Sequence, residues 1–191
     1  MNYSQINFLL GNTTECIKKV IKKDVFCIID SQMKGVSLEG KDNCKCINFF
    51  DEQELESCLE SVEDVQSVTV YVSADYGQDY DKFFEEMNTI LTRLVIVSKE
   101  IYKLAMFNRN LKVWYINLID GQKSSAHQEL TEALSGGIST MAKVLGLEVS
   151  KKKLHANYVK VTDIEKTDDL VEFIEQLSTK DMYLNLQDIT I

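Results

Sequence analysis

The fold is decided by residues 129–149, ELTEALSGGISTMAKVLGLEV, together with the segment LHANYVKV at residues 154–161. The first stretch predicts a helix and the second predicts a strand. A pair of small residues, Gly136 and Gly137, lies inside the helix and would let another helix or a backbone segment approach closely. We therefore expect a helix followed by a strand near the end of an α/β domain.

The rest of the chain repeats this alternation of apolar runs and segments with helical spacing. Candidate strands are residues 6–10, 25–30, 46–50, 67–73, 111–119, 155–161 and 182–186. Candidate helices are residues 13–23, 51–62, 79–108 and 129–149, with a short acidic helix starting at residue 164. This order predicts a Rossmann-like, doubly wound α/β fold in one domain over residues 1–191. We expect a mostly parallel sheet of about six or seven strands with helices on both faces.

The segment 79–108 is the longest expected helix. Its apolar side chains recur at three- and four-residue steps, from Phe83 through Ile90 and Val97 to Ala105. That spacing keeps one side of a helix apolar over many turns, so we expect this side to cover the sheet.

The opening stretch resembles the late helix and strand of the short-chain dehydrogenase/reductase family. The shared features are the glycine pair, the Leu145-x-x-Glu148 pattern at the helix end and Asn157 in the next strand. The resemblance implies a Tyr-x-x-x-Lys pair at the helix start, but aligning Glu148 places Thr131 and Ser135 there. In a carbonyl reductase the phenol donates a proton, and a nearby ammonium lowers its pKa. Thr and Ser hydroxyls titrate too high to replace that pair.

The cofactor turn is also altered. A dinucleotide fold needs several glycines after the first strand so that the backbone can approach the pyrophosphate. Here Gly11 is the single glycine of the turn, and the Thr13 and Thr14 hydroxyls are better interpreted as helix caps. Asp30 ends the second strand, where such folds often place an acid for the ribose hydroxyls. Gly11 and Asp30 are thus the only candidate residues for NAD or NADP.

Two further family sites differ. The segment SADYG at residues 73–77 keeps the Ala and Gly of the family's Asn-Asn-Ala-Gly motif without the Asn pair. Residues 117–119, NLI, stand where the resemblance implies a catalytic serine. Because four family sites are altered together, we interpret the chain as a degenerate reductase that has no catalytic residues and binds no cofactor.

Three segments resemble the structural subdomain of polyketide synthase ketoreductases. These segments are WYINLIDG at 114–121, ALSGGISTMAKVLGLE at 133–148 and MYLNLQDITI at 182–191. The resemblance implies a shortened Rossmann-like unit that binds no cofactor and braces a catalytic half. We therefore expect a protein partner, such as a ketoreductase or another polyketide synthase component. Pairing of helices 79–108 and 129–149 with their copies in a second chain would give a homodimer.

Composition narrows the function classes. A formal net charge of −9 argues against a nucleic-acid groove, because an acidic surface repels phosphates. The apolar runs are too short to cross a membrane, and MNYSQIN at the start is no signal peptide, so we expect a cytoplasmic protein. The five cysteines fit reduced thiols, and Cys44-x-Cys46 does not have the spacing of a zinc site, so we expect no metal.

Two alternatives stay open from the residues. The first is an NADP- or NAD-dependent oxidoreductase with rearranged catalytic groups, for which the candidates are Tyr76, Lys123, Ser124 and His127. The second is a sensor that binds a small ligand in the crevice at the carboxyl ends of the strands.

Overall fold

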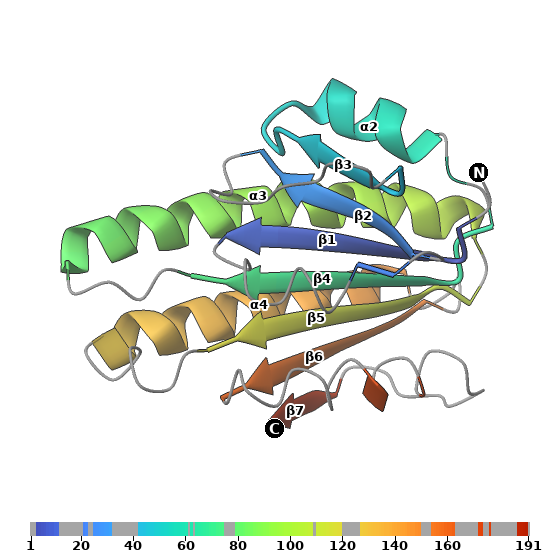
Figure 1. The fold of residues 1–191 in the computed structure, drawn as a ribbon. Helices are drawn as coiled ribbons and strands as arrows, with labels where there is room; N and C mark the ends of the chain where they lie inside the picture. Colours follow the sequence, from blue (N-terminus) through green and yellow to red (C-terminus); the bar gives the residue numbers. More distant parts are fainter. Residues whose placement is uncertain are drawn as a thin grey trace.

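The strands of the computed structural model form a single parallel sheet. The sheet has seven strands in the order β3-β2-β1-β4-β5-β6-β7, and each neighbouring pair is parallel (Figure 1). The strands are β1 (Gln5–Gly11), β2 (Val25–Asp30), β3 (Cys44–Ile47), β4 (Ser67–Ser73), β5 (Lys112–Leu118), β6 (His155–Val161) and β7 (Asp188–Thr190). The structure describes residues 3–11, 21–22, 25–31, 42–60, 62, 64–74, 79–108, 110–119, 127–149, 154–162, 172–173, 176 and 187–190.

The strand order reverses direction between β1 and β4, which are neighbours in the sheet. Because all strands are parallel, their carboxyl ends meet at one edge, and a crevice for ligands forms in such sheets at the reversal. The predicted Rossmann-like, doubly wound fold with six or seven mostly parallel strands is therefore confirmed.

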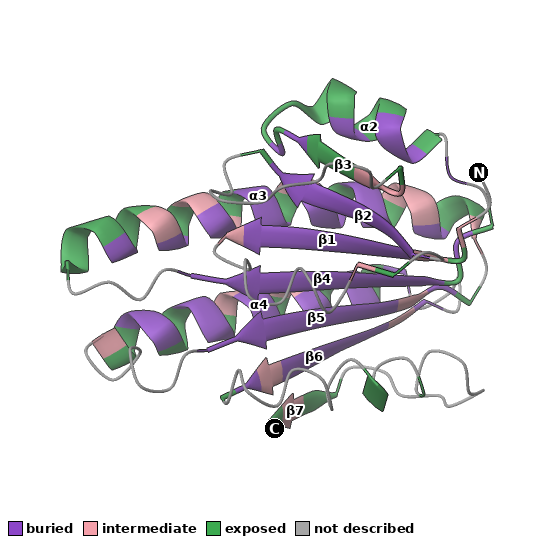
Figure 2. Ribbon diagram, in the orientation of Figure 1, coloured by how far each residue is buried: buried purple, intermediate pink, exposed green. Residues whose placement is uncertain are grey.

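The central strands are buried on both faces, as expected for near-continuous runs of β-branched and aromatic residues. All seven residues of β4 are buried, and Figure 2 shows the central strands almost entirely as buried. One apolar cluster includes Phe8, Val70 and Tyr115, and a second on the other face includes Leu9, Tyr71 and Trp114. Consecutive strand residues thus contribute to opposite faces.

Among the described residues, three helices cover the first of these faces. They are α2 (Glu52–Glu60), α3 (Tyr80–Phe107) and α4 (Gln128–Glu148). In Figure 1 the two long helices, α3 and α4, run behind the sheet along the strand direction. Asp51 caps α2 by accepting a hydrogen bond of 3.0 Å from the Glu54 amide, and Asp79 caps α3 with one of 3.3 Å from the Lys82 amide.

The apolar spacing predicted for α3 is confirmed, because its buried residues include Phe83, Ile90, Val97 and Ala105. The predicted helix at 129–149 is confirmed within one residue at each end. The predicted strand at 182–186 lies outside the described residues, and so do most residues of the predicted helices at 13–23 and from 164. Residues 21–22 are described and are not helical, whereas residues 172–173 and 176 are described as helix.

The third strand ends earlier than predicted. The sequence favoured a strand through Phe50, but β3 ends at Ile47. The Asn48 side chain accepts a hydrogen bond of 3.1 Å from the Phe50 amide, and the Asn48 carbonyl accepts one of 2.8 Å from the Asp51 amide. An Asn that bonds to the backbone two residues later makes a turn, so the chain leaves the sheet and enters α2.

Candidate functional site

Gly11 and Ser73 end β1 and β4 at the point where the strand order reverses. Gly11 has a φ of +70°, a left-handed conformation that side chains with a Cβ rarely adopt. A Cβ added to Gly11 would lie 2.1 Å from the Ser73 carbonyl oxygen and 3.0 Å from Ile90 Cδ1. The close approach of two neighbouring strand ends and of α3 therefore requires glycine here.

Asp30 ends β2 in a buried ion pair with Arg93 of α3. Arg93 Nη1 lies 2.6 Å from Asp30 Oδ2, and the two side chains are 5% and 1% exposed. The Phe50 ring covers the guanidinium, with its centroid 4.7 Å from the Arg93 Cζ atom. Arg93 Nε and Nη2 are buried and have no hydrogen-bond partner in the described part of the chain. The Asp30 carboxylate is thus turned toward α3 and is not at the surface.

The surroundings of Gly11 and Asp30 show whether these residues could bind a dinucleotide. Gly11 places its missing Cβ against the backbone of Ser73, not toward open space. Asp30 is buried and neutralises a buried guanidinium, whereas an acid that binds ribose hydroxyls needs an accessible carboxylate. Gly11 and Asp30 therefore each have a structural role that explains them without a bound nucleotide.

The first turns of α4 hold a buried hydroxyl cluster. Thr131 Oγ1 donates a hydrogen bond of 3.0 Å to the His127 carbonyl, and Ser135 Oγ donates one of 2.8 Å to the Thr131 carbonyl. The side chain of Asn117, on β5, donates to Ser135 Oγ at 2.9 Å and to the Tyr158 hydroxyl at 3.3 Å. The hydroxyls at the family's Tyr and Lys positions are therefore bonded within the protein.

Tyr158, on β6, is the phenol in this cluster. Burial raises its pKa, and this effect exceeds the lowering by hydrogen bonds to Asn117 and Ser135 and by the Lys160 charge. The Lys160 ammonium lies 2.7 Å from Glu132 Oε1 and pairs with that carboxylate. Proton donation by a phenol near neutral pH needs a lowered pKa, so the environment of Tyr158 works against this chemistry.

Tyr115, on β5, is a second buried phenol on the same face of the sheet. Its hydroxyl lies 2.8 Å from Ser98 Oγ of α3, and burial raises its pKa well above the ordinary value of 10.0. This hydrogen bond ties β5 to the middle of the long helix. Tyr115 is therefore a packing residue.

Among the candidates for rearranged catalysis, only His127 lies in the described residues. Its ring centroid is 5.8 Å from those of Tyr80 and Phe83, at the junction of α3 and α4. His127 Nε2 is buried without a hydrogen-bond partner within the described ranges. Tyr76, Lys123 and Ser124 lie outside the described residues, so their grouping with His127 stays a prediction.

Arg93 was not predicted from the sequence as the buried partner of Asp30. Its signal was an arginine three residues after Ile90 and four before Val97, on the apolar side of α3. A charged residue at such a position is buried and needs a partner of opposite charge. The only buried carboxylate at the nearby strand ends among the described residues is Asp30.

The described residues contain neither a cluster of metal-binding side chains nor a helix that could cross a membrane. No group of three His, Cys, Asp or Glu side chains there is placed to hold a metal ion. The exposed Cys46 thiol has a raised pKa, caused by partial burial and by the charges of Asp30 and Glu54. No described helix combines the length and the apolar character that a membrane crossing requires.

Solved structures that superpose on this chain include short-chain dehydrogenases/reductases. A short chain dehydrogenase from Mycobacterium smegmatis superposes with a TM-score of 0.67 and 9% identity, over 98% of this chain and 91% of that one. A 3-ketoacyl-(acyl-carrier-protein) reductase from Brucella melitensis, complexed with NADH, has a TM-score of 0.66 and 12% identity, over 99% and 97% of the chains. A short-chain dehydrogenase/reductase from Serratia marcescens has a TM-score of 0.59 and 11% identity, over 99% and 96%.

No protein-family model and no curated protein sequence matches this chain. At identities of 9 to 12%, the structural neighbours show a shared fold. Their cofactors and activities belong to those proteins, because one fold hosts many functions.

Proposed function

We propose that this chain is a non-catalytic protein with the short-chain dehydrogenase/reductase fold, and that it acts by binding another protein. It has no catalytic residues of its own and binds neither NADP nor NAD. Its partner is a ketoreductase or another component of polyketide or related secondary-metabolite biosynthesis. It works in the cytoplasm as a brace for the catalytic unit.

The Asp30–Arg93 ion pair is the observation that carries this proposal. Both charged groups are buried at the strand ends where nucleotides bind in such folds, and each neutralises the other. A ribose that displaced Arg93 from Asp30 would leave a buried guanidinium without its partner. That cost opposes cofactor binding, and it supports a role for the fold without the nucleotide.

The outward sides of α3 and α4 support a role in binding. On α3 the exposed apolar residues Phe84, Val95, Tyr102 and Met106 follow one another at helical spacing along one side. Leu147, near the end of α4, is 63% exposed. Exposed apolar residues that line up on neighbouring elements indicate a protein interface better than scattered ones do.

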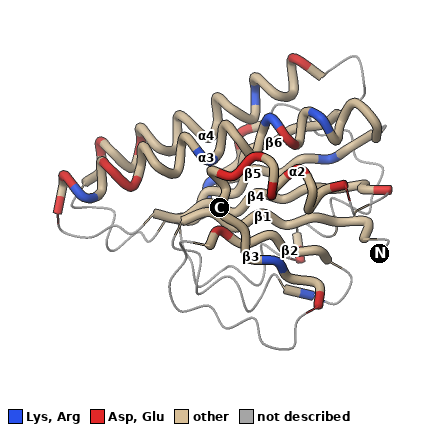
Figure 3. The backbone as a smooth tube through the Cα atoms, turned by 90° about the horizontal axis from the view of Figure 1, so that it is seen from above, with Lys and Arg blue, Asp and Glu red and all other residues tan. Residues whose placement is uncertain are grey.

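The contact between the two helices is close and helps to form one continuous surface. A Cβ added to Gly137 would lie 2.7 Å from Leu91 Cδ2, so the glycine leaves room for the leucine between the helices. Gly136 faces open space. The middle of α4, residues 133–142, has no charged side chain and appears as tan tube in Figure 3. We propose that this α3/α4 surface pairs with its copy in a homodimer or with the homologous helices of a ketoreductase.

Binding to a ketoreductase tests the partner directly. The catalytic subdomain of a polyketide synthase ketoreductase would be immobilised and the chain passed over it, with Val95→Glu as the disruptive variant. We expect binding by the wild type and at least about tenfold weaker binding by the variant, because a buried carboxylate would need a partner. Equal binding by the wild type and the variant would show that the α3/α4 surface is not the interface. No binding by either protein would contradict a ketoreductase as the partner.

An NADP- or NAD-dependent oxidoreductase with non-standard catalytic residues is the second candidate. The observation in its favour is that the hydroxyls of Ser135 and Tyr158 both meet the Asn117 amide in one buried cluster. A phenol and a serine hydroxyl are the types of group that a carbonyl reductase uses, whereas the raised pKa of Tyr158 is the observation against this candidate. The test is to measure NADPH oxidation by the wild type in the presence of a panel of ketones. Activity that is lost in Tyr158→Phe would establish this candidate.

A further inference from the structure

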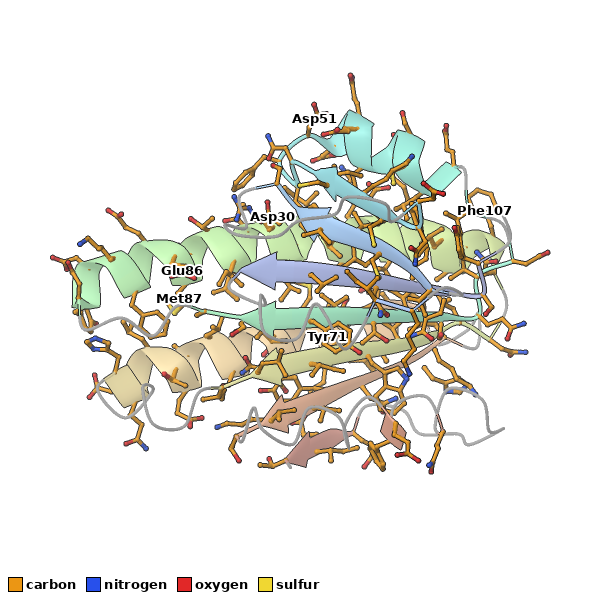
Figure 4. The ribbon with its side chains drawn as sticks, in the orientation of Figure 1. Asp30, Asp51, Tyr71, Glu86, Met87 and Phe107 are labelled. Atoms are coloured by element: carbon orange, nitrogen blue, oxygen red, sulfur yellow. The ribbon has the colours of Figure 1, made fainter. Side chains whose placement is uncertain are left out.

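A cavity of about 570 Å³ lies between α2 and the last turns of α3. It is formed at the amino-terminal edge of the sheet, opposite the strand ends that hold Gly11 and Asp30. In Figure 4, Phe107, which lines the cavity, lies at the edge of the sheet where the strands begin, whereas Asp30 lies near the tip of β2. The volume suits a small organic molecule. This inference is therefore independent of the proposed function.

The charge of the cavity wall is strongly unbalanced. The described lining residues include four carboxylates, from Glu56, Glu60, Asp64 and Glu100, and one ammonium, from Lys103. Carboxylates that converge on a cleft with low-dielectric walls produce a concentrated negative potential. The cavity thus favours a cation and disfavours an anion such as a nucleotide phosphate.

Glu100 shows that the negative charge is built into the wall and does not come only from exposed side chains. Its side chain is 2% exposed, and its Oε1 forms an ion pair of 3.0 Å with Lys103 Nζ. The same ammonium lies 3.0 Å from Glu56 Oε1. One lysine therefore pairs with two carboxylates, and the wall keeps a net negative charge.

Apart from Asn108, the remaining described residues of the wall are apolar. Leu59, Val62 and Leu104 line it, and the Phe107 ring at its side is 87% exposed. An exposed phenylalanine beside carboxylates suits a ligand that has both an apolar body and a positive charge, because the ring face also attracts cations. Neither a purely polar cation nor a neutral apolar molecule would use both parts of this wall.

The geometry points to a binding site for a small organic cation: a molecule with an alkylammonium group on an apolar body. The ammonium lies against the exposed carboxylate of Glu60, beside the wall that the buried Glu100 also makes negative. The apolar body lies against Leu59 and Phe107. Lys103 provides the built-in cation that holds Glu56 and Glu100 in place when the cavity is empty.

Titration with n-hexylammonium chloride, followed by amide NMR signals of the full chain, tests this site. We expect saturable shifts at Leu59, Val62 and Phe107, with dissociation at about 1 mM or tighter. 1-Hexanol and hexanoate have the same apolar length without the positive charge, and we expect each to bind at least about tenfold more weakly. Equal binding of 1-hexanol and hexylammonium would overturn the assignment of a cation site.

Two variants shift the affinity in opposite directions. Lys103→Met removes the competing ammonium and should strengthen hexylammonium binding about tenfold, whereas Glu60→Gln at the rim should weaken it about threefold. Glu85→Gln, on α3 far from the cavity, is the matched control and should change nothing. Because Glu60 is exposed, its variant keeps the fold even where Lys103→Met is unstable. Unchanged affinity in Glu60→Gln, or no saturable shift in the wild type, would refute the site.

Discussion

Gly11 shows how one residue at the strand reversal has a structural role. Its φ of +70° and the 2.1 Å distance from an added Cβ to the Ser73 carbonyl oxygen exclude any side chain. We expect Gly11→Ala to lower the free energy of unfolding by about 2–4 kcal/mol, from backbone strain and overpacking together. Urea unfolding followed by the fluorescence of the buried Trp114 measures this loss.

Gly136→Ala is the matched control for that change. Gly136 is exposed in the interior of α4 with no atom within 4 Å of an added Cβ. Alanine should therefore stabilise the protein by about 0.5–1 kcal/mol, through helix propensity alone. A Gly11→Ala protein as stable as wild type would contradict the described packing of β1 against β4.

The buried Asp30–Arg93 pair predicts that a single variant loses much more stability than the double variant. Arg93→Met leaves a buried carboxylate without its partner and should cost about 3–5 kcal/mol of unfolding free energy. Asp30→Leu combined with Arg93→Met removes both charges and should restore most of this loss. The comparison is made by urea unfolding at constant pH.

Lys99→Met, on the same helix, serves as the control for Arg93→Met. Lys99 pairs with Glu52 at the surface, where solvent screens the two charges. Little change in stability is expected from its loss. If Arg93→Met were as mild as Lys99→Met, the charges of Asp30 and Arg93 would not be buried as described.

At the scale of elements, the sequence predicted β4, β6, α3 and α4 well, because their apolar patterns are long and unbroken. It misplaced the end of β3, because a side chain to backbone hydrogen bond of Asn48 overrides the apolar character of Phe49 and Phe50. The partner of Asp30 was not predicted, because an ion pair between β2 and α3 depends on how the sheet and helix pack.

His155, the first residue of β6, makes the stability of the folded state depend on pH. Burial, and then the charge of Lys112 on β5, lower its pKa below the ordinary value of 6.5. The folded state therefore binds a proton less readily than the unfolded state, so stability is full above about pH 6.5 and is lost as the pH falls toward the folded pKa. An NMR titration of the ring protons should give a midpoint below 6.5.

Lys112→Met provides the matched variant for His155. Removing the lysine charge should move the His155 midpoint upward, toward 6.5, while the contribution of burial remains. A midpoint at or above 6.5 in the wild type would show that His155 is not in the environment described for it.

The outer side of α3 predicts self-association. Val95, 52% exposed, lies within the apolar side that includes Phe84 and Tyr102. If two copies pair through this surface, sedimentation velocity should show a dimer for the wild type and a monomer for Val95→Glu. Lys82→Glu adds a carboxylate to another side of the same helix and should leave the dimer intact. A wild type that is monomeric at all concentrations would contradict the homodimer, and the surface could then bind only a different protein.

On the scale of the whole molecule, the sequence predicted the fold. The packing explains what Ser135, Thr131 and Asn117 do, because they form hydrogen bonds inside the protein. The cavity beside Glu100 could not be predicted, because its wall combines α2, α3 and the segment between α2 and β4.

Calorimetric titration of the full chain with NADPH, and separately with NADH, tests the central claim most directly. The claim is that the dinucleotide fold is retained while the residues at the strand ends serve packing. We predict no binding of either nucleotide tighter than about 1 mM. A dissociation constant of about 10 µM or lower for either one would contradict the account.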